Sequence, residues 1–241
     1  MTVTKQAEKL DVSGDGAART SRGRATRARI LNCALRLMWR YGYSEIGVNR
    51  LIEEAGVLKG SFYHFFPSKL DLLLAMFDHL WSIQRRQIER IYQTKLAPAE
   101  SLLAHIDWMC RAQIAAKQEE GFVPGHLHMA AGVTLIEEYP ELAEKVRSMA
   151  QEHNAFIFQT LMQITPHGEA VARRQTNILF YFIAGAMMQG RLYNSLDPIN
   201  EIPVFAESLI RLLQSGKALD TPGDSADRAS FPASGQEKGT V

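Results

Sequence analysis

Residues 46–71 read IGVNRLIEEAGVLKGSFYHFFPSKLD, a stretch that predicts two short helices joined by a glycine turn. Apolar residues recur at helical spacing in its first half, at Val48, Leu51, Ile52 and Ala55. Gly56 is expected to end this helix, because glycine readily adopts the left-handed conformation of a helix C-terminus. The second helix is predicted to begin near Lys59 and to run to about Phe66, where Pro67 blocks its continuation.

The second helix carries a polar face without an acidic residue. Its apolar positions are Phe62, Phe65 and Phe66. The remaining side chains are expected to face solvent, and they are Lys59, Gly60, Ser61, Tyr63 and His64. Such a set suits the DNA major groove, where the N-terminal residues of a recognition helix meet base edges and phosphates. Asn49 and Arg50, at the start of the first short helix, are expected near the DNA backbone.

The run AGVLKGSFYHFFPSKLDLL, residues 55–73, resembles the helix-turn-helix of the tetracycline-repressor (TetR) family, whose usual pattern is close to AGVSKGSFYHYFxSKEDLL. The resemblance extends upstream through RARILNCALRLMWRYGYSEIGV and covers about residues 26–75. Gly47 stands where the family commonly has Ser or Thr, and Leu58 where it commonly has Ser or Pro. Both positions precede a helix, so each is expected to lack a side-chain cap worth roughly 0.5–2 kcal/mol.

The resemblance implies an all-α protein of about nine helices, with a three-helix head and a larger helical body. We expect a disordered basic arm over residues 1–23, a DNA-binding domain over 24–67, a ligand-binding and dimerisation body over 68–216, and a disordered tail over 217–241. It also implies a homodimeric repressor that a small-molecule inducer releases from an inverted-repeat operator. Within such a head, Lys59, Gly60 and Ser61 are expected at base edges and at a close backbone approach, Tyr63 and His64 at phosphates or bases, and Lys69 at a phosphate.

Charge is unevenly distributed along a chain whose net charge is only +1. Between Arg19 and Lys69 there are ten lysines and arginines against three acids, a local net charge of +7. Counterion release then predicts a DNA affinity that falls steeply with salt, although a basic surface without a partner is the alternative reading of charge alone. Within this tract Arg22, Arg24 and Arg27 are candidates for minor-groove or phosphate contacts.

Two segments near the end of the chain bear on assembly. The run ILFYFIAGAMM (Ile178 to Met188) is apolar on every side and too short to span a bilayer, which takes about 20 residues. A helix from Pro198 to Gln214 carries an apolar stripe. We expect both to form a dimer interface through Ile178, Phe182, Gly185, Gly190, Phe205, Leu209 and Leu212. The alternative is that the first of them is the central core helix of a monomer.

The body is expected to hold the inducer. Candidate lining residues are Trp108, Met109, Phe122, His126, His128, Met129, Phe156, Tyr181, Met187 and Met188, although core packing is the commoner explanation of such a set. Phe122 occupies a position where some relatives have cysteine, which argues against thiol-based sensing. His105, Cys110, His126 and His128 could converge on a metal only across helices, so no metal and no cofactor are expected.

The remaining motifs argue against catalysis. The sequence contains no Gly-x-Ser-x-Gly turn, no phosphate-binding glycine loop and no dinucleotide fingerprint, so we expect no enzyme, with an all-helical enzyme kept as the rival. Cys33 is interpreted as an inert buried thiol. Because the chain has two cysteines and no apparent secretion signal, we expect it in the cytoplasm, associated with the bacterial nucleoid. A transcriptional activator and a ligand-independent regulator remain open alternatives.

Overall fold

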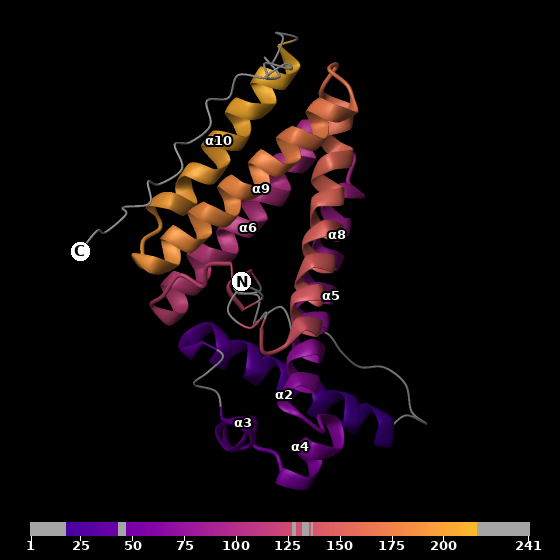
Figure 1. Ribbon diagram of the computed structural model, residues 1–241, viewed down its shortest axis with the longest axis vertical. Coiled ribbons are helices and arrows are strands. Elements are labelled where there is room, and N and C mark those ends of the chain that lie inside the picture. Colours follow the sequence, from indigo (N-terminus) through magenta and orange to yellow (C-terminus); the bar gives the residue numbers. More distant parts are fainter. Residues whose placement is uncertain (1–17, 43–46, 127–128, 132–134, 136, 216–241) are drawn as a thin grey trace, which may run out of the picture.

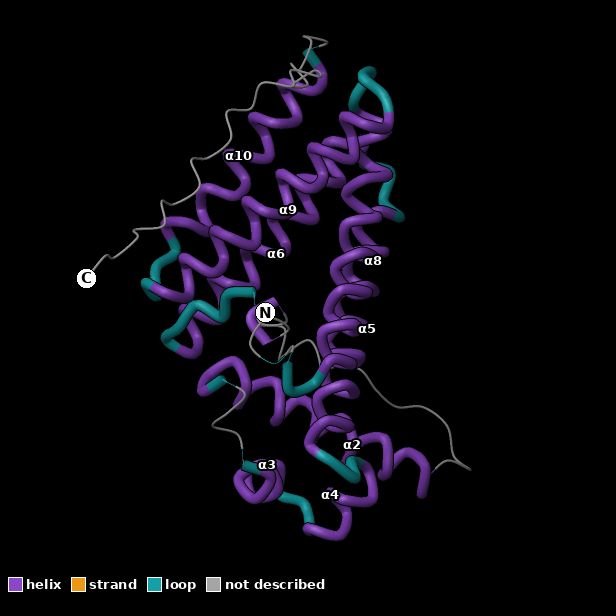
Figure 2. The backbone as a smooth tube through the Cα atoms, in the orientation of Figure 1, coloured by secondary structure: helices purple, strands orange, loops and turns teal. Residues whose placement is uncertain are grey.

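The computed structural model describes residues 18–42, 47–126, 129–131, 135 and 137–215. Every regular element within these residues is helical and none is a strand, which confirms the all-α class (Figure 2). Eight helices have described bounds, and residues 129–131 form a further helical segment. The eight are α2 (Ala18–Tyr41), α3 (Val48–Ala55), α4 (Lys59–Phe65), α5 (Lys69–Tyr92), α6 (Pro98–Glu120), α8 (Pro140–Ile164), α9 (Glu169–Leu192) and α10 (Asp197–Gln214). Within the described residues no helix is long and apolar enough to cross a membrane.

Helices α2, α3 and α4 form a small head at one end of the molecule (Figure 1). Neither α3, with eight residues, nor α4, with seven, is long enough to be stable alone. Packing against the rest of the head keeps α3 and α4 folded. Leu51 and Ala55 of α3 and Phe62 of α4 are buried in one apolar core with α2 and the first turns of α5.

Helix α5 joins the head to the body. Its first turn carries a capping box, because Ser68 Oγ accepts from the Asp71 backbone N–H and Asp71 Oδ2 accepts from the Ser68 backbone N–H, both at 3.0 Å. The buried stripe of α5 continues from Leu73 through Phe77 and Leu80 to Ile88. The first turns of α5 therefore belong to the core of the head, and the helix as a whole packs against α8 and α6 of the body.

The body consists of two groups of helices. Helices α5 and α8 lie side by side, while α6, α9 and α10 pack together across from them (Figure 1). Leu102, Ile183 and Ile202 lie at the centre of the second group, and each is at most 1% exposed. Ala131 and Leu135, from the segment that joins α6 to α8, and Leu142 of the first turn of α8 instead pack into the core of the head. The head is therefore attached to the body by this segment as well as by α5.

One predicted boundary differs from the structure. The sequence interpretation placed residues 1–23 in a disordered arm, yet α2 already begins at Ala18. Arg22, Arg24 and Arg27 consequently lie on a helix. Ala17 to Arg19 and Ala25 to Arg29 contain no Pro, and Gly23 alone does not end the helix, because arginine and alanine are strong helix formers. The predicted tail, residues 217–241, lies outside the described residues.

Replacing the capping serine tests how α5 is anchored. Ser68→Ala removes the acceptor for the Asp71 amide, so the free energy of unfolding in urea should fall by about 1 kcal/mol. Ser82→Ala on the same helix is the matched control, because Ser82 Oγ only donates to the His79 carbonyl within the helix. Equal midpoints and slopes for both variants would contradict the assigned role of the capping box.

Candidate nucleic-acid interface

The turn between α3 and α4 has the geometry that the sequence predicted. Gly56 lies in the left-handed region at φ 59° and ψ 45°, and its N–H donates to the Glu53 carbonyl at 3.0 Å. The next amide, that of Val57, donates to the Ile52 carbonyl at 3.1 Å. Val57 is half-buried against the core of the head. These contacts fix the angle at which α4 leaves α3.

Helix α4 presents the predicted polar face, here named the recognition face: Lys59, Gly60, Ser61, Tyr63 and His64. Phe62 is fully buried and Phe66, which follows the helix, is 1% exposed. Ser61 is half-buried, and the other four residues are exposed, Tyr63 to 43%. The rings of Phe62 and Phe66 are tilted relative to each other, and their centroids are 5.9 Å apart. They anchor the helix, so its opposite side is held outward.

Neither short helix has a side-chain cap. Gly47 and Leu58 precede α3 and α4 in extended conformation, and neither makes a side-chain hydrogen bond to its helix, as the sequence predicted. The amides at the start of α4 are therefore not occupied by a side-chain cap. Amides in this position are suitable donors for a phosphate oxygen.

The two residues expected near the DNA backbone at the start of α3 differ in their surroundings. Asn49 is exposed. Arg50 instead makes contacts within the head, because its Nε donates to Glu54 Oε1 at 3.0 Å and its guanidinium lies 4.1 Å from the centre of the Tyr41 ring. The hydrogen bond to Glu54 raises the pKa of Arg50. Its charge is thus partly balanced before any DNA binds.

Lys69 begins α5 at the edge of the recognition face. The side chain is half-buried, and this burial lowers the pKa of its ammonium group, against a smaller opposite effect of Glu138. Glu138 belongs to the segment that joins α6 to α8. Lys69 therefore lies where the head meets this segment.

Arginines of α2 extend the basic surface beyond α4. Gly23, Arg24, Arg27 and Phe65 line an open hollow of about 550 Å³ between α2 and the end of α4. The Arg27 guanidinium lies 5.4 Å from the centre of the Phe66 ring. Arg22, Arg24 and Arg27 are exposed, and the first turn of α2 contains no acid. Helix α2 thus brings cationic groups beside the recognition helix.

The body places only some of the predicted pocket residues near one another. Trp108, His126 and Phe156 join a group of aromatic rings and imidazoles between α5, α6, α8 and α9. Sequence reasoning missed its other members, which are Trp81, Tyr92, His105, His153 and Phe180. A signal was available, because His105 and Trp108, like His153 and Phe156, are three residues apart and share a helix face.

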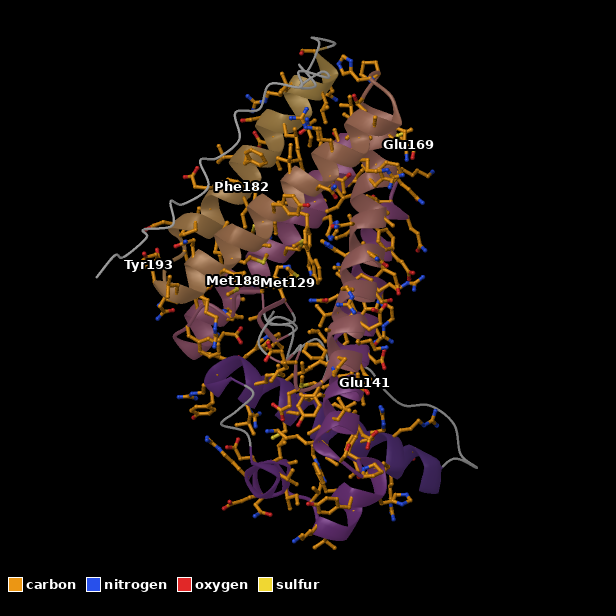
Figure 3. The ribbon with its side chains drawn as sticks, in the orientation of Figure 1. Met129, Glu141, Glu169, Phe182, Met188 and Tyr193 are labelled. Carbon is orange, nitrogen blue, oxygen red and sulfur yellow. The ribbon has the colours of Figure 1, made fainter. Side chains whose placement is uncertain are left out.

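Other predicted pocket residues lie elsewhere. Tyr181 and Met188, which were also predicted to line the pocket, are 66% and 41% exposed on α9. Phe122 packs against the core of the head, and Met187 is buried in the core of the body. Met109 and Met129 are half-buried (Met129 is labelled in Figure 3), and His128 lies outside the described residues.

The predicted dimer residues also divide into two groups. Gly185 and Leu212 are exposed, and Ile178, Phe182 and Phe205 are half-buried, with the Phe182 and Phe205 rings stacked at 4.2 Å. Gly190 and Leu209 were assigned to the wrong face. Gly190 is buried against Ile199 and Ser195 of its own chain, and Leu209 is 6% exposed in the core of the body. Because α9 is apolar on all sides, periodicity could not distinguish its two faces.

The two cysteines are buried thiols. Cys33 is 4% exposed, and burial raises its pKa, which agrees with the inert thiol expected there. Cys110 is also 4% exposed, and burial raises its pKa to about 12. Its Sγ donates to the Ile199 carbonyl at 3.7 Å. Among the described residues no three His, Cys, Asp or Glu side chains are arranged to hold a metal ion.

The head has the features of a helix-turn-helix DNA-binding protein: two short helices, a left-handed glycine between them, and an exposed basic second helix beside a basic α2. Residues 30–76 match the model of the bacterial regulatory proteins of the tetR family. Residues 30–76 therefore form a DNA-binding head of the tetR type, as the resemblance implied, and the chain as a whole is similar to transcriptional regulators of that family.

Curated relatives and solved structures agree with this assignment. The transcriptional regulator LmrA of Bacillus subtilis strain 168 is 27% identical over 180 residues, which cover 74% of this chain and 90% of LmrA. The transcriptional repressor NemR of Escherichia coli strain K12 is 23% identical over 198 residues, which cover 77% of this chain and 94% of NemR. A TetR-family regulator from Streptomyces coelicolor has the same fold, with a TM-score of 0.65 and 23% identity over 78% of this chain and 96% of that chain.

Proposed function

We propose that the protein is a homodimeric repressor that binds an inverted-repeat operator and leaves it when a small molecule binds the body. The recognition face of α4 carries this proposal: its exposed groups include Lys59, Tyr63 and His64, and buried Phe62 and Phe66 hold them outward. The fixed outward face allows side chains to meet base edges without reordering the backbone. Its place of action would be the cytoplasm, on chromosomal DNA.

Dimerisation is supported by an apolar surface on α9 and α10, here named the outer face. Figure 3 labels Phe182, Met188 and Tyr193 along α9 and just beyond its end. Large apolar side chains rarely gather in this number on the surface of a monomer. The exposed members are Tyr181 (66%), Met188 (41%), Leu192 (72%), Tyr193 (70%), Val204 (57%) and Leu212 (42%). A second copy related by a two-fold axis would cover the same surface on both protomers.

Two heads are needed because one recognition helix reads too few base pairs to be selective in a genome. A symmetric pair whose α4 helices lie about 34–36 Å apart would enter successive major grooves on one side of the duplex. Helix α5 reaches from the capping box at Ser68 to Tyr92 in the body. A ligand that changed its tilt would change the distance between heads. By linkage, such a ligand must bind the released conformation more tightly than the DNA-bound one.

The first test is a nuclease footprint on DNA flanking the protein's own gene, where a protected inverted repeat is expected. On that DNA, Tyr63→Ala and Lys59→Ala should each weaken binding about thirtyfold or more, because each removes a polar contact, worth roughly 1–3 kcal/mol, from both heads. Lys95→Ala, at an exposed lysine of the body, is the matched control. Wild-type affinity for both head variants, with the dimer intact, would refute the assigned recognition face.

The arginines of α2 should act on phosphates rather than bases. In the double variant Arg24→Ala with Arg27→Ala, four cations are lost per dimer, so the slope of log affinity against log salt should become shallower by about 3–4. Sequence preference should remain. Arg111→Ala with Arg147→Ala removes the same charge from exposed sites on the body. If both double variants show the wild-type slope, α2 does not contact the DNA backbone.

A charge on the outer face should separate the protomers. Tyr181→Glu places a carboxylate on the exposed side of α9, where a partner would have to bury it, so light scattering at micromolar concentration should show monomer. Leu96→Glu introduces the same charge at another exposed apolar residue, 45% accessible, between α5 and α6, and should leave the dimer unchanged. A wild-type protein that is monomeric under these conditions would refute the proposed assembly.

A further inference from the structure

A chain of hydrogen-bonded rings crosses the body between three helices. Tyr92 of α5 lies with its Oη 3.2 Å from Nδ1 of His105 on α6. The other nitrogen of the same imidazole, Nε2, lies 3.2 Å from Nε2 of His153 on α8. Nothing in the proposed DNA contacts or in the proposed dimer uses these three side chains.

Further aromatic side chains surround this chain, and we name the six residues together the ring cluster. Phe156 stacks on Tyr92 with ring centroids 5.6 Å apart and planes at 18°. Trp108 lies beside His105 at 6.2 Å, and Phe180 of α9 lies beside His153 at 6.3 Å. Four helices thus contribute aromatic surface to one place.

The ring cluster is uncharged at neutral pH. Burial lowers the pKa of His153 to about 4 and holds the pKa of His105 well below its usual value, and it raises the pKa of Tyr92 to about 12. Both imidazoles are therefore neutral and the phenol keeps its proton. Glu152, which precedes His153 in the chain, already accepts from Arg85 and Trp81, each at 3.0 Å. A charged guest would lose its hydration here without gaining a counter-charge.

The hydrogen-bond chain ends at one ring nitrogen, Nδ1 of His153. A neutral imidazole has one donor and one acceptor, so the chain can run from Tyr92 to His153 or in the reverse direction. In the first case Nδ1 of His153 is a donor, and in the second it is an acceptor. Across the described ranges of the chain, this nitrogen makes no hydrogen bond. A hydroxyl group can pair with it in either case, because a hydroxyl both donates and accepts.

The rings are not completely enclosed by protein. His105 has no exposed surface, whereas Tyr92, Trp108, His153 and Phe156 are only half-buried. The accessible ring faces of these four residues, which come from α5, α6 and α8, would suit a flat guest.

We propose that the ring cluster is the effector site, and that its ligand is an uncharged, planar aromatic molecule whose hydroxyl group pairs with Nδ1 of His153. This inference rests on the proposed control of DNA binding by a small molecule. The site also has a direct connection to the head. Trp81 and Arg85 of α5 bind Glu152, the residue next to His153, so a guest that displaced α8 would act on the helix that carries the head.

The experiment compares three probes of equal ring size on the purified full-length protein at pH 7: 2-naphthol, naphthalene without the hydroxyl, and 2-naphthoate, which is ionised. Binding is measured by calorimetry and by tryptophan fluorescence. We expect 2-naphthol to bind about fivefold or more tightly than naphthalene, the effect of one hydrogen bond, and 2-naphthoate to bind most weakly.

Variants assign the preference to one atom. His153→Phe keeps a ring but removes Nδ1, so the preference for 2-naphthol over naphthalene should vanish. His153→Asn keeps a hydrogen-bonding group near the same position and should retain it. His167→Phe, between α8 and α9, is the control histidine. Should His153→Phe fail to fold, Phe156→Leu should weaken both naphthalene and 2-naphthol by removing stacking surface.

Three results would overturn the proposal. They are an equal or tighter affinity for 2-naphthoate, an unchanged preference in folded His153→Phe, and no binding of 2-naphthol up to its solubility limit. Release of operator DNA is measured separately. If 2-naphthol binds as described but leaves DNA binding unchanged, the ring cluster stands as a site and the proposed inducer control fails. If other compounds release the DNA while the probes fail, inducer control stands and this ligand class is wrong.

Discussion

The burial of Phe62 and Phe66 is the interaction on which the rest of the structure depends. Helix α4 has seven residues and no side-chain cap, so its own hydrogen bonds cannot keep it folded. Two phenylalanines exposed by at most 1% fix both its position and its rotation. Because they occupy one side of a single helical turn, the polar side chains between them have to point away from the head. Stability and recognition are therefore set by the same contacts.

The same principle connects the head to the body. The core that buries Phe62 also contains Leu73 and Phe77 of α5 and Leu135 from the segment between α6 and α8. Packed side chains therefore connect the body to the head at two places. Arg85 and Trp81, which bind Glu152, join α5 to α8. The proposed effector site thus lies beside the helix whose tilt would set the distance between two heads.

Local features were predictable from the sequence, and relations between distant segments were not. The glycine turn at Gly56, the capping box at Ser68 and the buried side of α4 each depend on residues within one or two helical turns. Helix α9 is apolar all round, so periodicity could not show that Gly190 faces its own chain while Tyr181 faces outward. His105 and His153 are 48 residues apart, and only the packing of α6 against α8 brings their imidazoles together.

The most direct measurement of the central claim is protection of guanine N7 from methylation, because this atom lies in the major groove. The account predicts that wild-type protein protects guanines in two patches about one helical turn, 10–10.5 base pairs, apart and related by two-fold symmetry. Tyr63→Ala should lose this protection at concentrations where wild type is saturated. Stable binding to an inverted repeat without any protected guanine N7, at a site that contains guanines in both half-sites, would contradict it.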